Sequence, residues 1–360
     1  MTTSVPGLDD SRARSPIQPD EIAAVANWMS GQGLGGGPLT EVAALGGGTQ
    51  NVMVTFVRDG RPYVLRRGPR HLRPQSNKAI LRETRVLDAL KTSDVPHPQL
   101  IAVCADPTPL GGAVFYLMEP IDGFNPSVEL PPQHANDPDI RERMAFNIID
   151  ALAKLGEIDH RAVGLNDFGK PDGFLERQVP RWLAELESYS GFDGYHGPEI
   201  PNIDLVADWL VRNRPAQQPA GIMHGDFHAA NVMFDRSSPD VAAIVDWEMA
   251  TIGDPLLDLG WLLATWRLPQ APSVFGGPLM DSAPLPSAAD LTARYGRRSS
   301  RDLSAMTWYT VLACFKLGIL LEGTFARATA GLAPRRTGDE LHAATLQLFE
   351  RAADLMNGEQ

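Results

Sequence analysis

The fold is constrained most by a polar loop that leads into two short apolar runs, in a part of the chain where the spacing is otherwise helical. The loop, residues 224–231, reads HGDFHAAN and places an Asp and an Asn five residues apart. The first apolar run lies within residues 231–234. The second, 241–245, follows a polar turn and leads into Asp246-Trp247-Glu248. Short apolar runs joined by a polar turn are typical of a β-hairpin. We therefore expect a hairpin that holds this polar loop in a fixed position.

The residue types in this layout suit phosphoryl transfer, a reaction that depends mostly on positioning and charge stabilisation. Asp226 would accept the proton of an attacking hydroxyl, while the Asn231 oxygen and Asp246 would hold Mg²⁺ against nucleotide phosphates. The alternative is that these are three ordinary turn residues. We expect His224 to support the polar loop by packing or hydrogen bonding, and Asp258 to accept hydrogen bonds from backbone N–H groups of the loop.

The segments HGDFHAAN and IVDWEMATIGDPLLD resemble the aminoglycoside phosphotransferase / choline kinase family, which are small-molecule kinases with a protein-kinase-like fold. The resemblance runs from about residue 40 to about residue 330. The segments GGGTQN, YVLRRGP and AVGLNDFGKPDGFLERQVPRW are similar to a narrower subset, the kinase domains attached to acyl-CoA dehydrogenases. The resemblance implies that Asp226 and Asn231 are catalytic, with Asp226 as the base. It also implies that Asn231 and Asp246 are metal ligands, with Glu248 near a second metal ion.

The resemblance implies an α+β, bilobal fold with a small antiparallel-sheet N-lobe that carries one key helix, and a larger, mainly helical C-lobe. The residues themselves predict a hairpin around Asp59-Gly60, a helix over 77–90 and strands over 100–104 and 114–119. Helical spacing dominates after Pro120, in six segments: 140–158, 174–186, 204–211, 258–265, 302–325 and 339–356. We expect a disordered leader over 1–19, a nucleotide-binding lobe over 20–120 and a catalytic and substrate-binding lobe over 121–360.

A glycine-rich segment precedes the first predicted hairpin strand. Glycines there let backbone N–H groups approach phosphates, although Asn51 stands where a G-x-G-x-x-G loop would have its last glycine. For the nucleotide we expect contacts from Gly46, Gly47, Gly48, Thr49 and Asn51. By the resemblance, the adenine would meet backbone groups of Glu119 and Ile121. The cofactors would be ATP, with GTP left open, and Mg²⁺.

The strand that carries a phosphate-binding Lys in kinase folds has no Lys in this chain, because it reads Val64-Leu65-Arg66-Arg67. Arg66 is the preferred substitute and Arg67 the alternative, since an arginine keeps the charge and grips phosphate with two donors. Glu83 would be the partner of Arg66, which would explain a carboxylate on an apolar helix face. In the alternative interpretation, both arginines are exposed edge charges and Glu83 is a rim residue.

Charge is distributed unevenly along the 360 residues, whose net charge is −12. Residues 58–91 hold ten Lys/Arg and three Asp/Glu, so this strip is +7 and the remainder is −19. The overall charge argues against nucleic acid as a partner. The strip would suit a nucleotide and an anionic substrate tail such as a CoA ester, or it is a solvated basic face. The acidic remainder would suit a polycationic aminoglycoside.

Two cysteines, Cys104 and Cys314, lie in apolar surroundings and fit buried thiols in a reducing compartment. The N-terminus has no apolar signal-peptide core, and the apolar stretch 306–321 is interrupted by Lys316. We therefore expect a cytoplasmic protein with no membrane partner, while its oligomeric state is open. Segments 160–200 and 268–290, the latter a candidate lid, are expected to form the acceptor pocket.

The leading hypothesis is an ATP- and Mg²⁺-dependent kinase that acts on a hydroxyl of a small molecule, either a hydroxyacyl-CoA or related metabolite or an aminoglycoside-like compound. The second hypothesis is a nucleotide-binding regulatory or scaffold protein without turnover, which the missing Lys and the irregular glycine loop favour. A protein kinase or a nucleotidyl transferase is a third. The absence of an A-P-E segment counts against a protein kinase.

Overall fold

The computed structural model describes residues 17–45, 51–267 and 275–358. Gly46, Gly47, Gly48 and Thr49 of the expected phosphate loop lie outside these residues, as do most of the expected leader and residues 268–274 of the candidate lid. The chain forms two compact units. The first comprises residues 1–91 and 98–120, and the second comprises residues 92–97 and 121–360.

The first unit is built on an antiparallel sheet with the strand order β1-β2-β3-β5-β4. Asp59 and Gly60 connect two of its strands with φ angles of 49° and 78°. Positive φ at both central residues makes the two-residue turn that matches strand twist, so the predicted hairpin is confirmed. The strands are β1 (Thr40–Ala44), β2 (Val52–Arg58), β3 (Arg61–Arg67), β4 (Leu100–Cys104) and β5 (Phe115–Met118).

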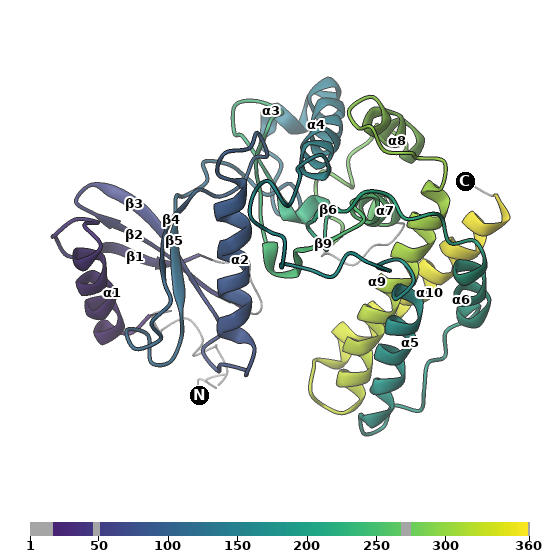
Figure 1. Cartoon of the computed structure of the whole chain (residues 1–360), viewed down its shortest axis with the longest axis horizontal. Coiled ribbons are helices and arrows are strands. Elements are labelled where there is room, and N and C mark those ends of the chain that lie inside the picture. The colour runs from purple at the N-terminus through teal and green to yellow at the C-terminus, as the bar shows by residue number, and fades with distance from the viewer. Residues whose placement is uncertain (1–16, 46–50, 268–274, 359–360) are drawn as a thin grey trace, which may run out of the picture. The chain divides into compact units, whose positions relative to one another are not determined.

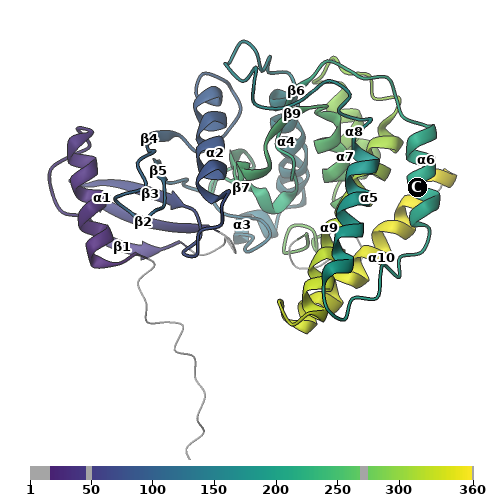
Figure 2. The same ribbon diagram turned by 60° about the horizontal axis from the view of Figure 1, so that its bottom comes forward.

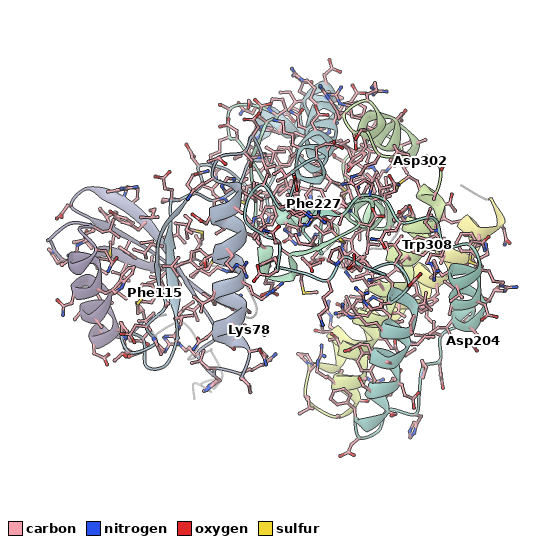
Figure 3. The ribbon with its side chains drawn as sticks, in the orientation of Figure 1. Lys78, Phe115, Asp204, Phe227, Asp302 and Trp308 are labelled. Atoms are coloured by element: carbon pink, nitrogen blue, oxygen red, sulfur yellow. The ribbon has the colours of Figure 1, made fainter. Side chains whose placement is uncertain are left out.

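Two helices, α1 (Pro19–Gly31) and α2 (Ser76–Leu90), cover opposite faces of this sheet (Figures 1 and 2). Alternate side chains of a strand point to opposite faces, so β3 contributes to both contacts. The face toward α1 holds a continuous apolar core that includes Phe115, labelled in Figure 3. The glycine run 31–39 leads from α1 into β1, and its Gly36 donates a backbone hydrogen bond of 2.9 Å to Asp59 Oδ2. These residues are thus fixed to the hairpin turn.

The second unit is mainly helical. Its centre is α9 (Met306–Thr329), which packs against α7 (Leu256–Thr265) and runs beside α10 (Arg335–Asn357) (Figure 1). Trp308 of α9, labelled in Figure 3, donates its indole N–H to the Leu210 carbonyl at 2.9 Å. The other helices are α3 (Pro132–Ala135), α4 (Pro138–Gly156), α5 (Gln178–Ser188), α6 (Ile203–Arg212) and α8 (Ala288–Gly296).

By length and composition α9 would pass as a membrane-spanning helix, and it is the one described helix that does. Most of its apolar window, 83%, is buried inside the second unit. A core helix of a folded unit has the same composition as a membrane span, because both are surrounded by apolar groups. Its hydrophobicity is therefore accounted for by packing against α7 and α10.

Two short antiparallel ladders frame the polar loop in this unit. β6 (Gly221–Met223) pairs with β9 (Thr251–Gly253), and β7 (Val232–Phe234) pairs with β8 (Val241–Ile244). The predicted hairpin of β7 and β8 is confirmed. The pair β6 and β9 was not anticipated, because three-residue strands are too short to show a period.

Two predicted helices begin later than expected, and a third helix was not predicted. The helix expected from 174 begins at Gln178, after a turn in which the Phe174 N–H bonds to the Pro171 carbonyl. The helix expected from 302 begins at Met306, because the Asp302 carboxylate accepts the N–H of Ser304 and closes a local turn. Helix α8 starts in the last residues of the Pro/Gly/Ser-rich segment, where Ser287 and Asp290 form a capping box.

Candidate catalytic site

The polar loop, residues 224–231, connects β6 to β7 and is anchored by a buried carboxylate of α7. Asp258 accepts the N–H of His224 at 2.6 Å and the N–H of Gly225 at 2.9 Å. Burial raises the pKa of Asp258, while its hydrogen bonds and the charges of His224 and Lys316 act in the opposite direction. The expectation that Asp258 receives loop N–H groups is confirmed.

Gly225 must be a glycine at this point of the loop. Its φ is +86°, and a Cβ added there would lie 2.4 Å from the Met249 carbonyl oxygen. A side chain would therefore both strain the backbone and collide with the neighbouring segment. The close approach ties the start of the polar loop to the turn that follows β8.

His224 supports the polar loop from inside, as expected. Its Nε2 lies 2.8 Å from the Val245 carbonyl oxygen, and its ring centroid lies 4.9 Å from that of Trp247. His224 is fully buried, and so is Phe227, labelled in Figure 3. These contacts hold the loop between the β8 end and the interior, so His224 has a structural role.

Asp226 and Asn231 meet at the exposed edge of the polar loop. The Asn231 side-chain nitrogen donates to the Asp226 carbonyl at 2.9 Å and to Asp226 Oδ2 at 3.3 Å. His228 Nε2 lies 3.5 Å from Asp226 Oδ1. Among the described residues none hydrogen-bonds to the Asn231 side-chain oxygen, which is therefore available to a ligand.

The Asp226 carboxylate is held ionised. Burial alone would raise its pKa, but the hydrogen bond from His228 and the charges of His228, His224 and Lys316 lower the pKa to about 2. The side chain is nevertheless 35% exposed and can be reached by a ligand. His228 itself is covered by Phe275 of the candidate acceptor segment, with ring centroids 5.3 Å apart. An ionised, accessible carboxylate in a fixed loop can accept a proton.

Asp246 is brought beside Asn231 by the register of the second ladder. The Val245 N–H donates to the Asn231 carbonyl at 2.9 Å, so the next residue, Asp246, leaves the strand next to the end of the polar loop. Asp246 has φ 65° and ψ 62°, a left-handed conformation that is uncommon for a residue with a side chain. Glu248 follows in a single 3-10 turn, Trp247–Met249.

The oxygen donors of Asn231 and Asp246 fit Mg²⁺, which binds to one or two protein carboxylates and completes its shell with water and phosphate oxygens. In residues 17–45, 51–267 and 275–358 there is no group of three His, Cys, Asp or Glu side chains that could hold a metal ion by itself.

Arg66 and Glu83, in the sheet-containing unit, form a buried ion pair. Arg66 Nε lies 2.9 Å from Glu83 Oε2, and the two side chains are 8% and 3% exposed. Arg67 points to the opposite face of the sheet and pairs with Glu21 of α1 at 2.9 Å. The expected partnership of Arg66 with Glu83 is confirmed, and the interpretation of exposed edge charges is wrong. Strand alternation assigns each arginine its own partner.

The other described residues expected at the nucleotide site are Glu119, Asn51 and Ile121. The Glu119 side chain forms an exposed ion pair with Arg61 at 3.0 Å, and its backbone N–H donates to the Gln99 carbonyl. Only the Glu119 carbonyl is therefore left for an adenine contact from this residue. Asn51 is half-buried immediately before β2. Ile121 is the residue at which the chain passes from the first unit into the main part of the second.

Sequence reasoning missed two residues that hold the polar loop. Asn125 donates from its side-chain nitrogen to the Ala230 carbonyl at 2.7 Å, and Lys316 donates from Nζ to the Gly225 carbonyl at 3.0 Å. Lys316 left a signal in the sequence, because it is the only charge between Met306 and Leu321. Asn125 left none, since an Asn between Phe and Pro is typical of an ordinary turn.

Two curated proteins are similar to this chain over most of its length. Acyl-CoA dehydrogenase family member 11 from Gallus gallus is 28% identical over 353 residues, which cover 94% of this chain and 41% of that protein. Family member 10 from Mus musculus is 27% identical over 304 residues, which cover 83% of this chain and 28% of that protein. The chain thus spans less than half the length of these curated relatives.

Solved structures share the fold. A "putative aminoglycoside phosphotransferase" from Ralstonia eutropha JMP134 has a TM-score of 0.74 and 29% identity, covering 92% of this chain and 98% of that one. Aminoglycoside phosphotransferase APH(4)-Ia, in a ternary complex with ADP and hygromycin B, has a TM-score of 0.55 and 14% identity, covering 90% of this chain and 98% of that one.

The sequence profile of the phosphotransferase enzyme family matches residues 41–289. This span begins in β1 and includes the Arg66–Glu83 pair, the polar loop and both ladders that frame it. Because the match covers more than two thirds of the chain and all of its candidate site, this protein belongs to the phosphotransferase enzyme family.

Proposed function

We propose that the protein transfers the γ-phosphoryl group of ATP to a hydroxyl of a small molecule, with Asp226 as the general base. The observation that carries the proposal is the set formed by an ionised, accessible Asp226, the Asn231 amide beside it and Asp246 at the adjoining strand end. These are the groups that phosphoryl transfer requires, and the ladders around them provide the fixed positions on which the reaction depends.

Each residue has a defined part in the proposed reaction. Asp226 orients the acceptor hydroxyl and takes its proton as the oxygen attacks phosphorus. The oxygens of Asn231 and Asp246 would hold Mg²⁺, which when bound neutralises charge on the phosphates. Glu248 is placed on the turn after Asp246 and is the candidate for contact with a second ion.

Nucleotide binding is proposed to use Arg66, which Glu83 holds in position. Asn51 and the glycine segment before it, the Glu119 carbonyl and the Ile121 N–H complete the proposed set. ATP is the proposed donor, and structures of aminoglycoside phosphotransferase APH(4)-Ia, which has the same fold, contain ADP or AMP-PNP.

For the acceptor we propose an anionic hydroxy compound of the hydroxyacyl-CoA type rather than a polycationic aminoglycoside. The similarity to acyl-CoA dehydrogenase family members supports this choice. So does Arg181 of α5, an exposed guanidinium 5.1 Å from the Trp182 ring, whose charge acts on Lys316 next to the polar loop. A positive side chain there attracts an anion and repels a polycation.

The test incubates the protein with ATP, Mg²⁺ and either hydroxyacyl-CoA esters or aminoglycosides, and measures by mass spectrometry the gain of one phosphate. We expect the gain on the CoA esters, and R181M should raise their KM while R212M, an exposed arginine change on α6, should leave it unchanged. A gain on aminoglycosides alone would reject the acceptor class. Nucleotide binding without transfer to any acceptor, including those in a metabolite extract, would favour the scaffold function instead.

A further inference from the structure

A charged side chain lies inside the helical unit, directly against the backbone of the polar loop. Lys316 of α9 is only 6% exposed, and its Nζ donates a hydrogen bond of 3.0 Å to the Gly225 carbonyl. The ammonium lies 4.2 Å from the centroid of the Trp261 ring on α7 and 5.5 Å from that of Trp182 on α5. Three helices and the polar loop therefore enclose one lysine.

This lysine is costly for the fold. An ammonium has three N–H donors, yet within the described parts of the chain Gly225 supplies the one acceptor, and no carboxylate oxygen lies at ion-pair distance. The indole faces compensate in part through cation–π attraction. A methionine would fill the space between two indole rings without the cost of desolvating a charge. The presence of a charge at this position thus requires an explanation other than stability.

The charged groups around Lys316 show what its charge acts on. Asp258 on α7 and Asp226 in the polar loop are the negative groups that face it, while Arg181 on α5 is the positive one. His224 in the polar loop acts on the same two carboxylates. Gly225, the hydrogen-bond acceptor, is the residue immediately before Asp226. Lys316 therefore reaches Asp226 in two ways, through the backbone and through its charge.

We propose that Lys316 is a positioning residue of the phosphoryl-transfer site: its hydrogen bond to the Gly225 carbonyl fixes the backbone next to Asp226. This inference rests on the proposed function of Asp226 as the base. It assigns the buried lysine of α9 to catalysis rather than to the core in which it lies.

The groups around Lys316 determine the pH range in which it is charged. Burial lowers the pKa of Lys316 to about 8, against the opposing effect of Asp258 and Asp226. Its charge is therefore present below about pH 8 and is lost as the pH rises past that value. A neutral amine bonds the Gly225 carbonyl less strongly than an ammonium does. The kcat of the wild type should therefore fall as the pH rises past about 8.

Three substitutions separate the two contributions. K316M removes charge and donor, K316Q removes the charge and keeps a donor, and K316R keeps both. We expect K316M to lower kcat about 10- to 100-fold, the size of effect that a small misplacement of a reacting group produces. K316Q should recover part of kcat, because it keeps a donor. K316R should recover most of kcat and keep it above pH 8, because an arginine stays charged there.

Thermal unfolding distinguishes positioning from general packing. Because a buried charge is removed, the melting temperature of K316M should not fall below that of the wild type. K154M, a change at an exposed lysine of α4, is the control and should leave both kcat and the pH profile unchanged. In K316M, a fall in kcat together with a fall in melting temperature, with no recovery of kcat in K316R, would overturn the inference, as would wild-type kinetics in K316M. If the wild type itself transfers no phosphate, the proposed function fails instead.

Discussion

At the scale of single residues, β3 shows how one strand gives two adjacent arginines different roles. Arg66 pairs with Glu83 on the α2 face, and Arg67 pairs with Glu21 on the α1 face. The sequence could predict that Glu83 needed a partner, because a carboxylate on an apolar helix face is unfavourable unless it is paired. It could prefer Arg66 but could not exclude Arg67 until the strand register was known, since a shift of one residue exchanges the two faces.

If Arg66 and not Arg67 binds the nucleotide, removing the two ion pairs should have different effects on nucleotide affinity. Removing one member of a buried pair leaves the other charge uncompensated and destabilises the fold, whereas replacing both members by apolar residues is often neutral. We therefore expect the double variant R66M/E83M to keep its melting temperature and to lose affinity for ATP·Mg²⁺ by about tenfold or more, the loss of a charge-assisted contact. The matched variant R67M/E21M should bind the nucleotide as the wild type does. Calorimetric titration measures both, and equal affinities of the two variants would contradict the assignment of Arg66.

At the scale of elements, long periodic segments were predictable and short ones were not. The helices α4, α6, α7 and α10 and the hairpin β2–β3 carry enough residues for a period to appear. The strands β6 and β9 have three residues each, and their pairing is a tertiary contact between segments that lie far apart in the sequence. The residues of the polar loop could be identified from their motif, but Lys316 and Asn125 come from outside it and required the fold.

The approach of Gly225 to Met249 gives an element-scale prediction. G225A should destabilise the protein by more than about 2 kcal/mol and abolish phosphate transfer, because both the positive φ and a backbone collision oppose a Cβ. Gly331 also has a positive φ, +72°, but nothing lies within 4 Å of its added Cβ. G331A should therefore cost only about 1 kcal/mol for the backbone conformation. Urea unfolding measures both variants, and similar losses would show that the collision at Gly225 is absent.

At the scale of the whole molecule, the net charge argues against nucleic acid as a partner but does not select an acceptor. A basic strip over 58–91 lies in the sheet-containing unit, and the acidic remainder includes the helical unit. Membership of the phosphotransferase family and the ladders around the polar loop supply the type of reaction. Arg181, the acceptor contact that we propose, could not be found from a local sequence pattern, because its position depends on packing.

The proposed reaction depends on Asp226 taking the proton of the acceptor hydroxyl. The most direct measurement compares kcat of D226N with that of the wild type on an acceptor that the wild type phosphorylates, together with calorimetric binding of ATP·Mg²⁺. D208N, the same change at an exposed aspartate of α6, serves as the control. We predict unchanged nucleotide binding and a fall in kcat of about 100- to 10,000-fold, the usual contribution of a general base. Full turnover by D226N would contradict the assignment of Asp226 as the base.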